Sequence, residues 1–390
     1  MTLLFNVNYF IYFYTLWLVE TFLPIYFKSI SISDKWVGFL VGLFAASSSI
    51  TIIPVGFISD RLSPCLIIRF GIGLFMIYIL GLIKFNSLPL ISVVTLIGGF
   101  GSTLIHIGLS TTFYKGLEER GRGSRIGSFF FSSSAGYSLG PLSAGYLLHS
   151  SKMQSVFISG LICIFILFFL SFFIKERFRS RVSTGDKLKL SDYTSLLVQY
   201  RTIFLLLSVS VVGIHLGAEQ SSLSLFFKMN LHMPDKSIGT IYAFVGLWVG
   251  LLIYITGRIF DRTKKIIVFI WSGMIISGIF QIATTLTTGY WDALMIRLLH
   301  TVGDSFIVLC NGLLISIIFK ERSMGGGVGL VQGFRMGSIF LSATACGFLN
   351  GIYGYNINFI MSGVLSILFG LFVLFFMKRL PASIFYPSRP

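Results

Sequence analysis

The sequence predicts an all-α membrane protein in which twelve transmembrane helices form two pseudo-symmetric six-helix bundles. Hydrophobic residues fill 55% of the 390 positions and charged residues only 11%, and the mean hydropathy is +0.87. A globular protein of this length would not stay soluble with that composition. Apolar windows of about 20 residues, the length that crosses a bilayer core, recur along the chain. One short motif also appears twice, about half a chain apart.

The apolar windows define twelve spans. Backbone polar groups find no water in lipid, so each span should be helical. The continuous apolar runs exclude a closed barrel, whose strands of about ten residues alternate in polarity. The expected spans are residues 3–27, 36–58, 66–84, 88–113, 125–149, 153–174, 202–227, 238–259, 266–286, 291–319, 325–350 and 355–377.

An internal repeat divides the chain into two related halves. The motif G-x-x-x-D-R occurs twice, 201 residues apart, as Gly56, Asp60 and Arg61 and as Gly257, Asp261 and Arg262. Further matches at nearly the same offset pair Glu20 with Glu219 and Gly38 with Gly239. We therefore expect an N-terminal bundle over 1–174, a basic cytoplasmic linker over 175–201 and a C-terminal bundle over 202–390.

The net charge of +16 follows the pattern of a membrane protein and not that of a nucleic-acid-binding protein. With the N-terminus in the cytoplasm, 22 of the 30 Lys and Arg residues fall in inner loops and the tail, and 6 fall in outer loops. This asymmetry is the positive-inside rule. No aromatic-basic recognition element accompanies the charge. We expect a multi-pass protein of the plasma membrane with lipid around it, both termini in the cytoplasm, and no nucleic acid as partner.

The sequence contains no signature of a cofactor, a metal site or an enzyme. The four cysteines are scattered without a C-x-x-C pair, so they suggest neither a disulfide framework nor a metal site. No G-x-x-x-x-G-K-[ST] loop occurs, which argues against ATP as an energy source. The histidines lie on separate spans and form no compact catalytic constellation.

Six spans, a basic linker, six more spans and the duplicated G-x-x-x-D-R loops resemble the major facilitator superfamily over essentially the whole chain. The resemblance implies a carrier that works by alternating access, with Asp-Arg loops that latch the inner side closed in the outward-open state. Asp and Arg at a helix end, beside a Gly that allows close approach, suit such a charge latch. The alternative is an ordinary capped loop with basic flanks. The first copy departs from the family pattern after Arg61, where it continues as Leu-Ser-Pro-Cys.

The fifth span carries a second resemblance. Gly136, Gly140, Pro141 and Gly145 are similar to the G-x-x-x-G-P-x-x-G-G element of the antiporter branch of this superfamily, with Ala144 in place of the first paired Gly. Small residues four apart let two helices approach closely, and a proline permits a bend. Generic packing of membrane helices is the alternative explanation, because Gly and Pro are common there.

Ionisable residues inside the spans are the main candidates for the functional site, because each costs about 3 kcal/mol at mid-membrane unless it is paired or hydrated. They are Glu20 in span one, His106 in span four, His215 and Glu219 in span seven, and Arg297, His300 and Asp304 in span ten. The family resemblance implies that these four spans line the central cavity. Within span ten, Asn311 shares a helical face with the three charged or basic residues.

We assign roles to these groups by their chemistry. Glu219 is the first candidate for the proton carrier, because a carboxylate in a low-dielectric setting suits reversible protonation. Asp304 could also titrate, unless Arg297 and His300 hold it charged, and Glu20 could serve as a carrier or as an anchor for a cationic substrate. For each acid the alternative is a structural ion pair, such as Glu219 with Arg297.

The other candidates are assigned to the substrate cavity. His106 is more often a buried hydrogen-bonding residue than a relay. Arg335, with Gln332, is expected to face the inner half of the pore or a partner acid. Together with His215, Arg297, His300 and Asn311 they form the expected cavity set.

The sequence thus favours a monomeric secondary transporter that is coupled to protons and exports a small molecule. Proton-coupled uptake of a sugar, an organic acid or a peptide is the alternative within the same class. From a different class, a membrane receptor that does not transport remains open, although no large soluble extension is evident in the sequence.

Overall fold

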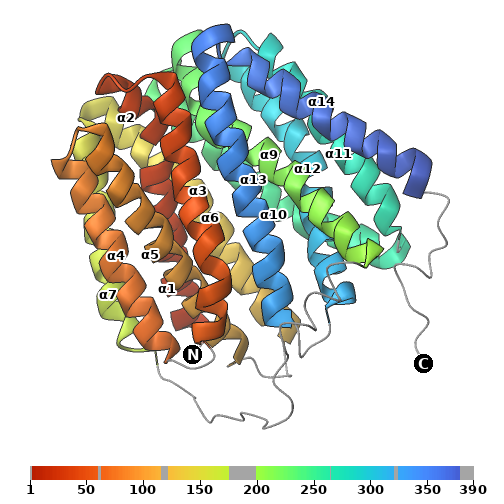
Figure 1. Cartoon of the computed structure of the whole chain (residues 1–390), viewed down its shortest axis with the longest axis horizontal. Coiled ribbons are helices and arrows are strands. Elements are labelled where there is room, and N and C mark those ends of the chain that lie inside the picture. The colour runs from red at the N-terminus through yellow and green to blue at the C-terminus, as the bar shows by residue number, and fades with distance from the viewer. Residues whose placement is uncertain are drawn as a thin grey trace.

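The computed structural model describes residues 2–59, 63–115, 122–174, 199–263, 265–319 and 324–377, and every regular element in these ranges is a helix (Figure 1). The first half contains α1 (Thr2–Glu20), α2 (Leu23–Ser29), α3 (Asp34–Ser59), α4 (Pro64–Lys84), α5 (Leu88–Lys115), α6 (Arg122–Ser150) and α7 (Met153–Ser171). The second half contains α9 (Tyr200–Leu225), α10 (Asp235–Thr263), α11 (Ile266–Ala283), α12 (Tyr290–Ile318), α13 (Met324–Tyr353) and α14 (Asn356–Phe372). Short π- and 3-10 segments, Phe226–Asn230, Thr284–Leu286 and Val373–Met377, extend α9, α11 and α14.

The helices match the predicted spans. Within the described ranges, eleven helical stretches are long and apolar enough to cross a membrane, the first of them formed by α1 and α2 together. The fifth predicted span corresponds to α6, which has 29 residues but is rich in Gly and Ser and is therefore less apolar. Because α6 packs between α1 and α10, it completes a bundle of twelve membrane helices. Of the expected linker, residues 175–198 lie outside the described ranges, and α9 already begins at Tyr200.

The turn that follows the first span recurs after the seventh. Ser31 and His232, 201 positions apart, both adopt the left-handed backbone region, with φ of 66° and 49°. Lys28 bonds the carboxylate of Asp34 at 2.8 Å, and Lys228 bonds that of Asp235 at 2.8 Å. Both aspartates lie in the first turn of a long helix, where a negative charge is favourable. The two halves therefore repeat this turn in detail as well as in helix order.

Two helix pairs join the halves: α3 packs on α13, and α6 packs on α10 (Figure 1). At one end of the molecule, where α3 and α10 begin, each pair meets through glycines. A Cβ placed on Gly38 would lie 2.5 Å from the Cα of Gly347, and one placed on Gly145 would lie 3.1 Å from the Cα of Gly239. Such contacts leave no room for a side chain. We call this end of the bundle the Asp34 end and the opposite end, where α3 and α10 finish, the Asp261 end.

Both helix pairs are looser toward the Asp261 end. On α13, a Cβ at Gly337 would meet Ser49 at 3.3 Å, and one at Gly333 would meet Ile52 at 3.5 Å. On α10, a Cβ at Gly250 would meet Ser134 at 3.4 Å. These are nearly ordinary van der Waals separations, so among the described residues the halves are held most tightly at the Asp34 end.

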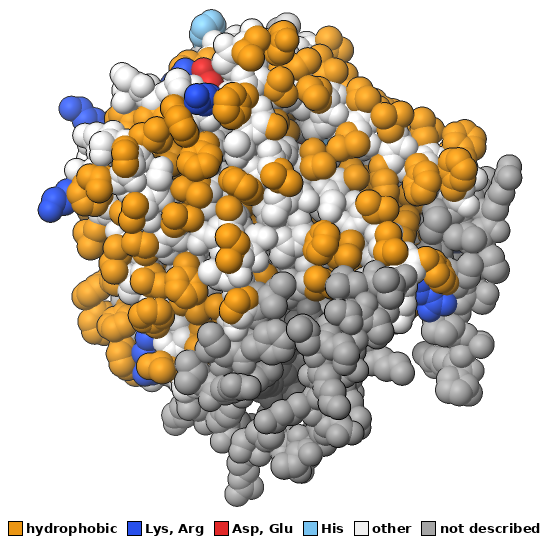
Figure 2. All heavy atoms as spheres, viewed as in Figure 1, with side chains coloured by type: hydrophobic (Ala, Val, Ile, Leu, Met, Phe, Trp, Pro, Cys, Tyr) orange, Lys and Arg blue, Asp and Glu red, His pale blue; other side chains and the backbone are white. Residues whose placement is uncertain are grey.

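The outer surface of the bundle suits lipid. Large apolar side chains such as Phe70, Ile162, Tyr254 and Leu341 are more than half exposed. Figure 2 shows hydrophobic side chains over the visible face of the described residues, with Lys and Arg near its margins. Since a water-exposed surface of this kind would drive aggregation, the surface supports the membrane assignment.

Candidate functional site

A central cavity of about 490 Å³ lies between the two halves. Its walls are partly aromatic, with Tyr12, Trp17, Phe44, Tyr137 and Tyr242 among the lining residues. Its charged and polar lining includes Glu20, His106, His215, Glu219, Arg297, Asp304, Gln332 and Arg335. Because these groups come from α1, α5, α9, α12 and α13, the cavity gathers residues that are far apart in the sequence.

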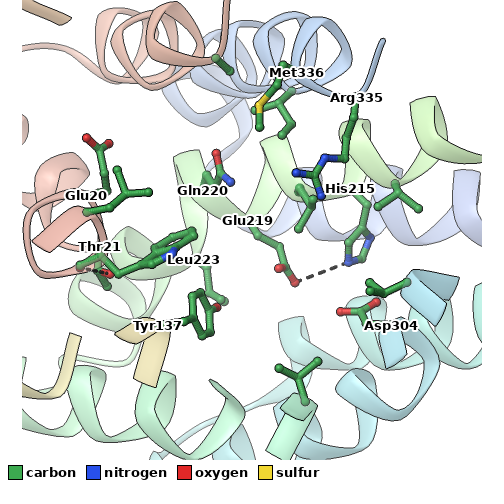
Figure 3. Close-up of a pocket in the computed structure, with 18 of the residues that line it drawn as sticks. Glu20, Thr21, Tyr137, His215, Glu219, Gln220, Leu223, Asp304, Arg335 and Met336 are labelled. Atoms are coloured by element: carbon green, nitrogen blue, oxygen red, sulfur yellow. Dashed lines mark hydrogen bonds and ion pairs between the residues drawn. The ribbon is translucent and has the colours of Figure 1, made fainter. Parts of the chain in front are cut away.

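Glu219 of α9 is the centre of a buried polar cluster in the second half. Its Oε1 accepts a hydrogen bond from the guanidinium of Arg297 on α12, and the two side chains form an ion pair. The same oxygen lies 3.1 Å from Nε2 of His300. It also lies 3.5 Å from Nε2 of His215, one turn back on α9 (Figure 3). The spacing of four between His215 and Glu219 places both on one helical face, as the sequence predicts.

Asp304 belongs to the same cluster from the α12 side. Its Oδ2 lies 3.0 Å from Nε2 of His300, and its Oδ1 accepts a hydrogen bond of 2.7 Å from Ser277. Gln281 accepts from Arg297 at 2.9 Å and thereby fixes the other side of the guanidinium. Ser277 and Gln281 were not among the residues predicted from the sequence. Their polarity within the otherwise apolar α11 is the signal that could have identified them.

Glu20 lies apart from this cluster, on the first-half side of the cavity. Figure 3 shows Glu20 and Thr21 at one side, with His215 and Asp304 at the other. The hydroxyl of Tyr78 on α4 donates to Glu20 at 2.7 Å, and the Tyr78 side chain is fully buried. No sequence pattern pointed to Tyr78, since one tyrosine among many aromatic residues carries no spacing signal.

Arg335 and Gln332 line the cavity from α13, and His106 lines it from α5. In Figure 3 the guanidinium of Arg335 lies near His215. Its Nε atom is buried and has no hydrogen-bond partner among the described residues. His106 Nδ1 lies 3.5 Å from the hydroxyl of Tyr9.

Two members of the expected cavity set lie behind the cavity wall. His300 is fully buried and, among the described residues, reaches the cavity through Glu219, Asp304 and His215. Asn311, two turns beyond Asp304 on α12, accepts a hydrogen bond of 2.9 Å from Ser208 of α9 and packs between the two helices. Asn311 shares a face of α12 with Asp304, but that face extends beyond the cavity. Asn311 therefore does not line the cavity.

The duplicated Asp-Arg motif is described in full only in its second copy. Gly56 belongs to α3, while Asp60 and Arg61 lie outside the described residues. Gly257, Asp261 and Arg262 form the last turns of α10, and the side chains of Asp261 and Arg262 are exposed.

The glycine-rich element of the fifth span is a packing surface. A Cβ on Gly136 would lie 2.7 Å from Tyr14 N, and one on Gly140 would lie 2.7 Å from Tyr14 O, so α6 approaches the backbone of α1. Gly145 and Pro141 face α10, where Pro141 O touches Gly239. The small residues therefore serve both an intra-half and an inter-half helix contact.

The cluster also offers atoms of the kind that hold metals. One nitrogen from each of His215 and His300 and one oxygen of Asp304 lie within 4.8 Å of one another. The guanidinium of Arg297 nearby already supplies positive charge to this site. A cation of single charge therefore balances the cluster better than a divalent ion.

Comparison with known proteins agrees with this architecture. The quinolone resistance protein NorA of Staphylococcus aureus strain MSSA476 is 22% identical over 301 residues, which cover 77% of each chain. Among solved structures, a D-xylose-proton symporter superposes with a TM-score of 0.77 at 16% identity and covers 96% of this chain and 97% of its own. The nucleoside transporter NupG does so with a TM-score of 0.76 at 14% identity, covering 97% and 99%.

The sequence itself decides the family. Residues 5–343 match the profile described as Major Facilitator Superfamily, which extends through both halves and includes every candidate residue of the cavity. Since the matched region spans most of the chain and the fold agrees, the protein is a transporter and not an enzyme, and it belongs to the Major Facilitator Superfamily.

Proposed function

We propose that this transporter exports a small organic molecule by alternating access and is driven by a proton gradient. The observation that carries the proposal is the central cavity, in which aromatic walls face ionisable groups from both halves. Aromatic surfaces bind flat, apolar molecules, while acids in a low-dielectric site can take up and release protons. The likeness to NorA, a quinolone resistance protein, supports export and suggests quinolones as first probes.

Three acids are the candidates for proton coupling. Glu219 and Asp304 share one hydrogen-bonded cluster, so their protonation states depend on each other. Glu20 bonds Tyr78 and lies across the cavity, where it is the candidate anchor for a cationic substrate group. His106, Gln332 and Arg335 are the candidate contacts for the polar part of a substrate.

The positive-inside distribution of Lys and Arg supports a cytoplasmic position for the Asp261 end and for both termini, in the plasma membrane. In that orientation the tight glycine contacts at the Asp34 end correspond to an inward-facing state. The two Asp-Arg loops then lie on the cytoplasmic side, where they would latch the opposite, outward-facing state. We also propose that the Gly136–Gly145 element has the role of the similar element in antiporters. The protein is further proposed to function as a monomer.

Uptake is the second candidate function, because the D-xylose-proton symporter shares the fold. Flux measurements separate the two. Purified protein is reconstituted into liposomes, a pH gradient of either sign is imposed, and movement of a fluorescent quinolone is followed. Exchange of quinolone against protons supports export by antiport, whereas movement of both in the same direction supports uptake. A membrane receptor that does not transport would show no flux above that of empty liposomes for the quinolone, a pentose, a nucleoside or a peptide.

A further inference from the structure

The imidazole of His300 is held in one orientation by a group that only accepts hydrogen bonds. Its Nδ1 lies 3.0 Å from the backbone carbonyl oxygen of Ser277 on α11. A carbonyl oxygen has no proton to give, so Nδ1 must carry the hydrogen. If His300 were neutral, its other nitrogen, Nε2, would therefore be an acceptor.

That nitrogen faces two carboxylate oxygens, which only accept hydrogen bonds, and the Nε2 of His215. Glu219 Oε1 lies 3.1 Å from His300 Nε2, Asp304 Oδ2 lies 3.0 Å away, and His215 Nε2 lies 3.1 Å away. The His300 ring is fully buried, so water does not relieve the contact. An unprotonated Nε2 would bring its lone pair against two carboxylates, whereas a proton there is shared favourably with both.

The charges of the cluster require one more positive charge. Two carboxylates face a single guanidinium, that of Arg297, which leaves a net charge of −1 in a buried site. One proton on His300 makes the cluster neutral, and a second proton on His215, at 3.1 Å, would place two like charges side by side. The two imidazole rings thus form a pair that holds one proton more than two neutral imidazoles would.

The other neighbours of the cluster leave this count unchanged. Tyr137 on α6 and Tyr242 on α10 face the cluster and are neutral hydroxyls, and α11 contributes the uncharged Ser277 and Gln281. Arg335 on α13 lies near His215 but makes no hydrogen bond to the cluster among the described residues. Its charge faces the cavity, where a substrate or water meets it.

We propose that the coupling proton is held by the His215–His300 pair, on His300 Nε2 between Glu219 and Asp304, and that His215 is its path to the cavity. The inference rests on the proton coupling proposed above and assigns it to an imidazole instead of a carboxyl group. His215 lines the cavity while His300 does not, so a proton leaving His300 passes to His215 Nε2 and then to cavity water. Glu219, bound by Arg297, acts as a fixed negative charge that positions this proton.

The chain has five histidines, which makes nitrogen NMR of ¹⁵N-histidine-labelled protein in lipid bilayers practical. At about pH 7.5, where an exposed histidine is mostly neutral, we expect one imidazolium signal that disappears in His300→Gln and correlates through space with a neutral His215. His106→Gln, which removes the other cavity histidine, should leave that signal in place. A His300 signal of the neutral form, with only Nδ1 protonated, would overturn the proposal.

A divalent cation is the competing occupant. If EDTA changes the His300 signal, or if Zn²⁺ binds once per chain to the wild type but not to His300→Gln, a metal holds the position and the proton assignment is wrong. We expect neither result.

Flux in liposomes tests the coupling role separately. His300→Gln should reduce quinolone accumulation driven by the pH gradient by about tenfold or more, while quinolone binding measured by thermal shift survives. The control His149→Gln, at an exposed position in the last turn of α6, should stay near the wild type. Gradient-driven accumulation retained by a folded His300→Gln would overturn the inference but leave the proposed function standing. A wild type without gradient-driven flux would instead contradict the proposed function, and the coupling role of this proton with it.

Discussion

Gly38 and Gly347 touch backbone to backbone across the α3–α13 contact, with the position of a Gly38 Cβ only 2.5 Å from the Cα of Gly347. Gly145 and Gly239 form the corresponding contact between α6 and α10. The second contact is related to the first by the internal repeat, because Gly239 follows Gly38 by 201 positions. Both contacts lie at the Asp34 end, so closure of that end depends on the absence of four side chains.

Gly347→Ala should weaken closure of the Asp34 end. The new methyl group would lie 2.7 Å from Asp34 O and 2.8 Å from Gly38 Cα, and we expect a cost of about 1–3 kcal/mol to the closed arrangement. Spin labels on cysteines at Ser33 and Tyr353, in a background without native cysteines, should report longer distances. Gly351→Ala is the matched control, because no described atom lies within 4 Å of its Cβ position. Equal distance distributions in both variants would contradict the role of the contact.

Asp60→Asn should slow transport with little loss of membrane insertion. The substitution keeps the polarity of the loop but removes the charge on which a latch depends, and coupling of this kind is typically about 1–3 kcal/mol. Asp261→Asn in the second copy should have a similar effect. The measurements are initial flux in liposomes and the amount of correctly inserted protein. A fully inserted Asp60→Asn with wild-type flux would show that the loop is only a capped turn.

A cysteine at Ser183, within the basic linker, should react with membrane-impermeant thiol reagents only from the cytoplasmic side. The positive-inside distribution predicts this orientation. Labelling is compared between intact cells and inside-out vesicles after the four native cysteines are replaced. A cysteine at Trp36, 38% exposed near the Asp34 end, should show the opposite preference. Labelling of the Ser183 cysteine in intact cells would reverse the assigned topology.

Glu219→Gln should abolish accumulation driven by the pH gradient while downhill exchange of substrate survives. Glutamine keeps the size of the side chain but supplies neither a titratable group nor the charge that attracts a proton to His300. It also leaves Arg297 without its ion pair, so we expect a loss of stability of about 3–5 kcal/mol. Flux is therefore compared only after thermal unfolding has confirmed a folded variant.

Glu20→Gln is the control for Glu219→Gln. It removes the repeat-related acid from the other side of the cavity, where the acid bonds Tyr78 and not the histidine pair. Uphill flux should persist in Glu20→Gln, while affinity for a cationic substrate falls. Unchanged uphill flux and an unchanged pH profile in Glu219→Gln would exclude Glu219 from coupling and make Asp304 the next candidate.

The sequence by itself determined that the protein lies in a membrane, that its spans are helices and that its two halves are repeats. Its composition and apolar windows require membrane helices, because a backbone in lipid must satisfy its own hydrogen bonds. The offset of 201 residues between the two G-x-x-x-D-R copies revealed the two halves. Spacing within one helix also placed His215 beside Glu219, and Arg297, His300 and Asp304 on one face, since the helical period is a property of the local chain.

Only the tertiary structure decided which of these groups meet across helices. Helical periodicity gives the face of a residue but neither the neighbouring helix nor its depth, so Asn311 was placed in the cavity although it bonds Ser208 behind it. For the same reason Ser277 and Tyr78 were missed, although each bonds an acid from another helix. The position of His300, between a backbone carbonyl and two carboxylates, exists only once α9, α11 and α12 are packed, and that packing gives the imidazole its proton.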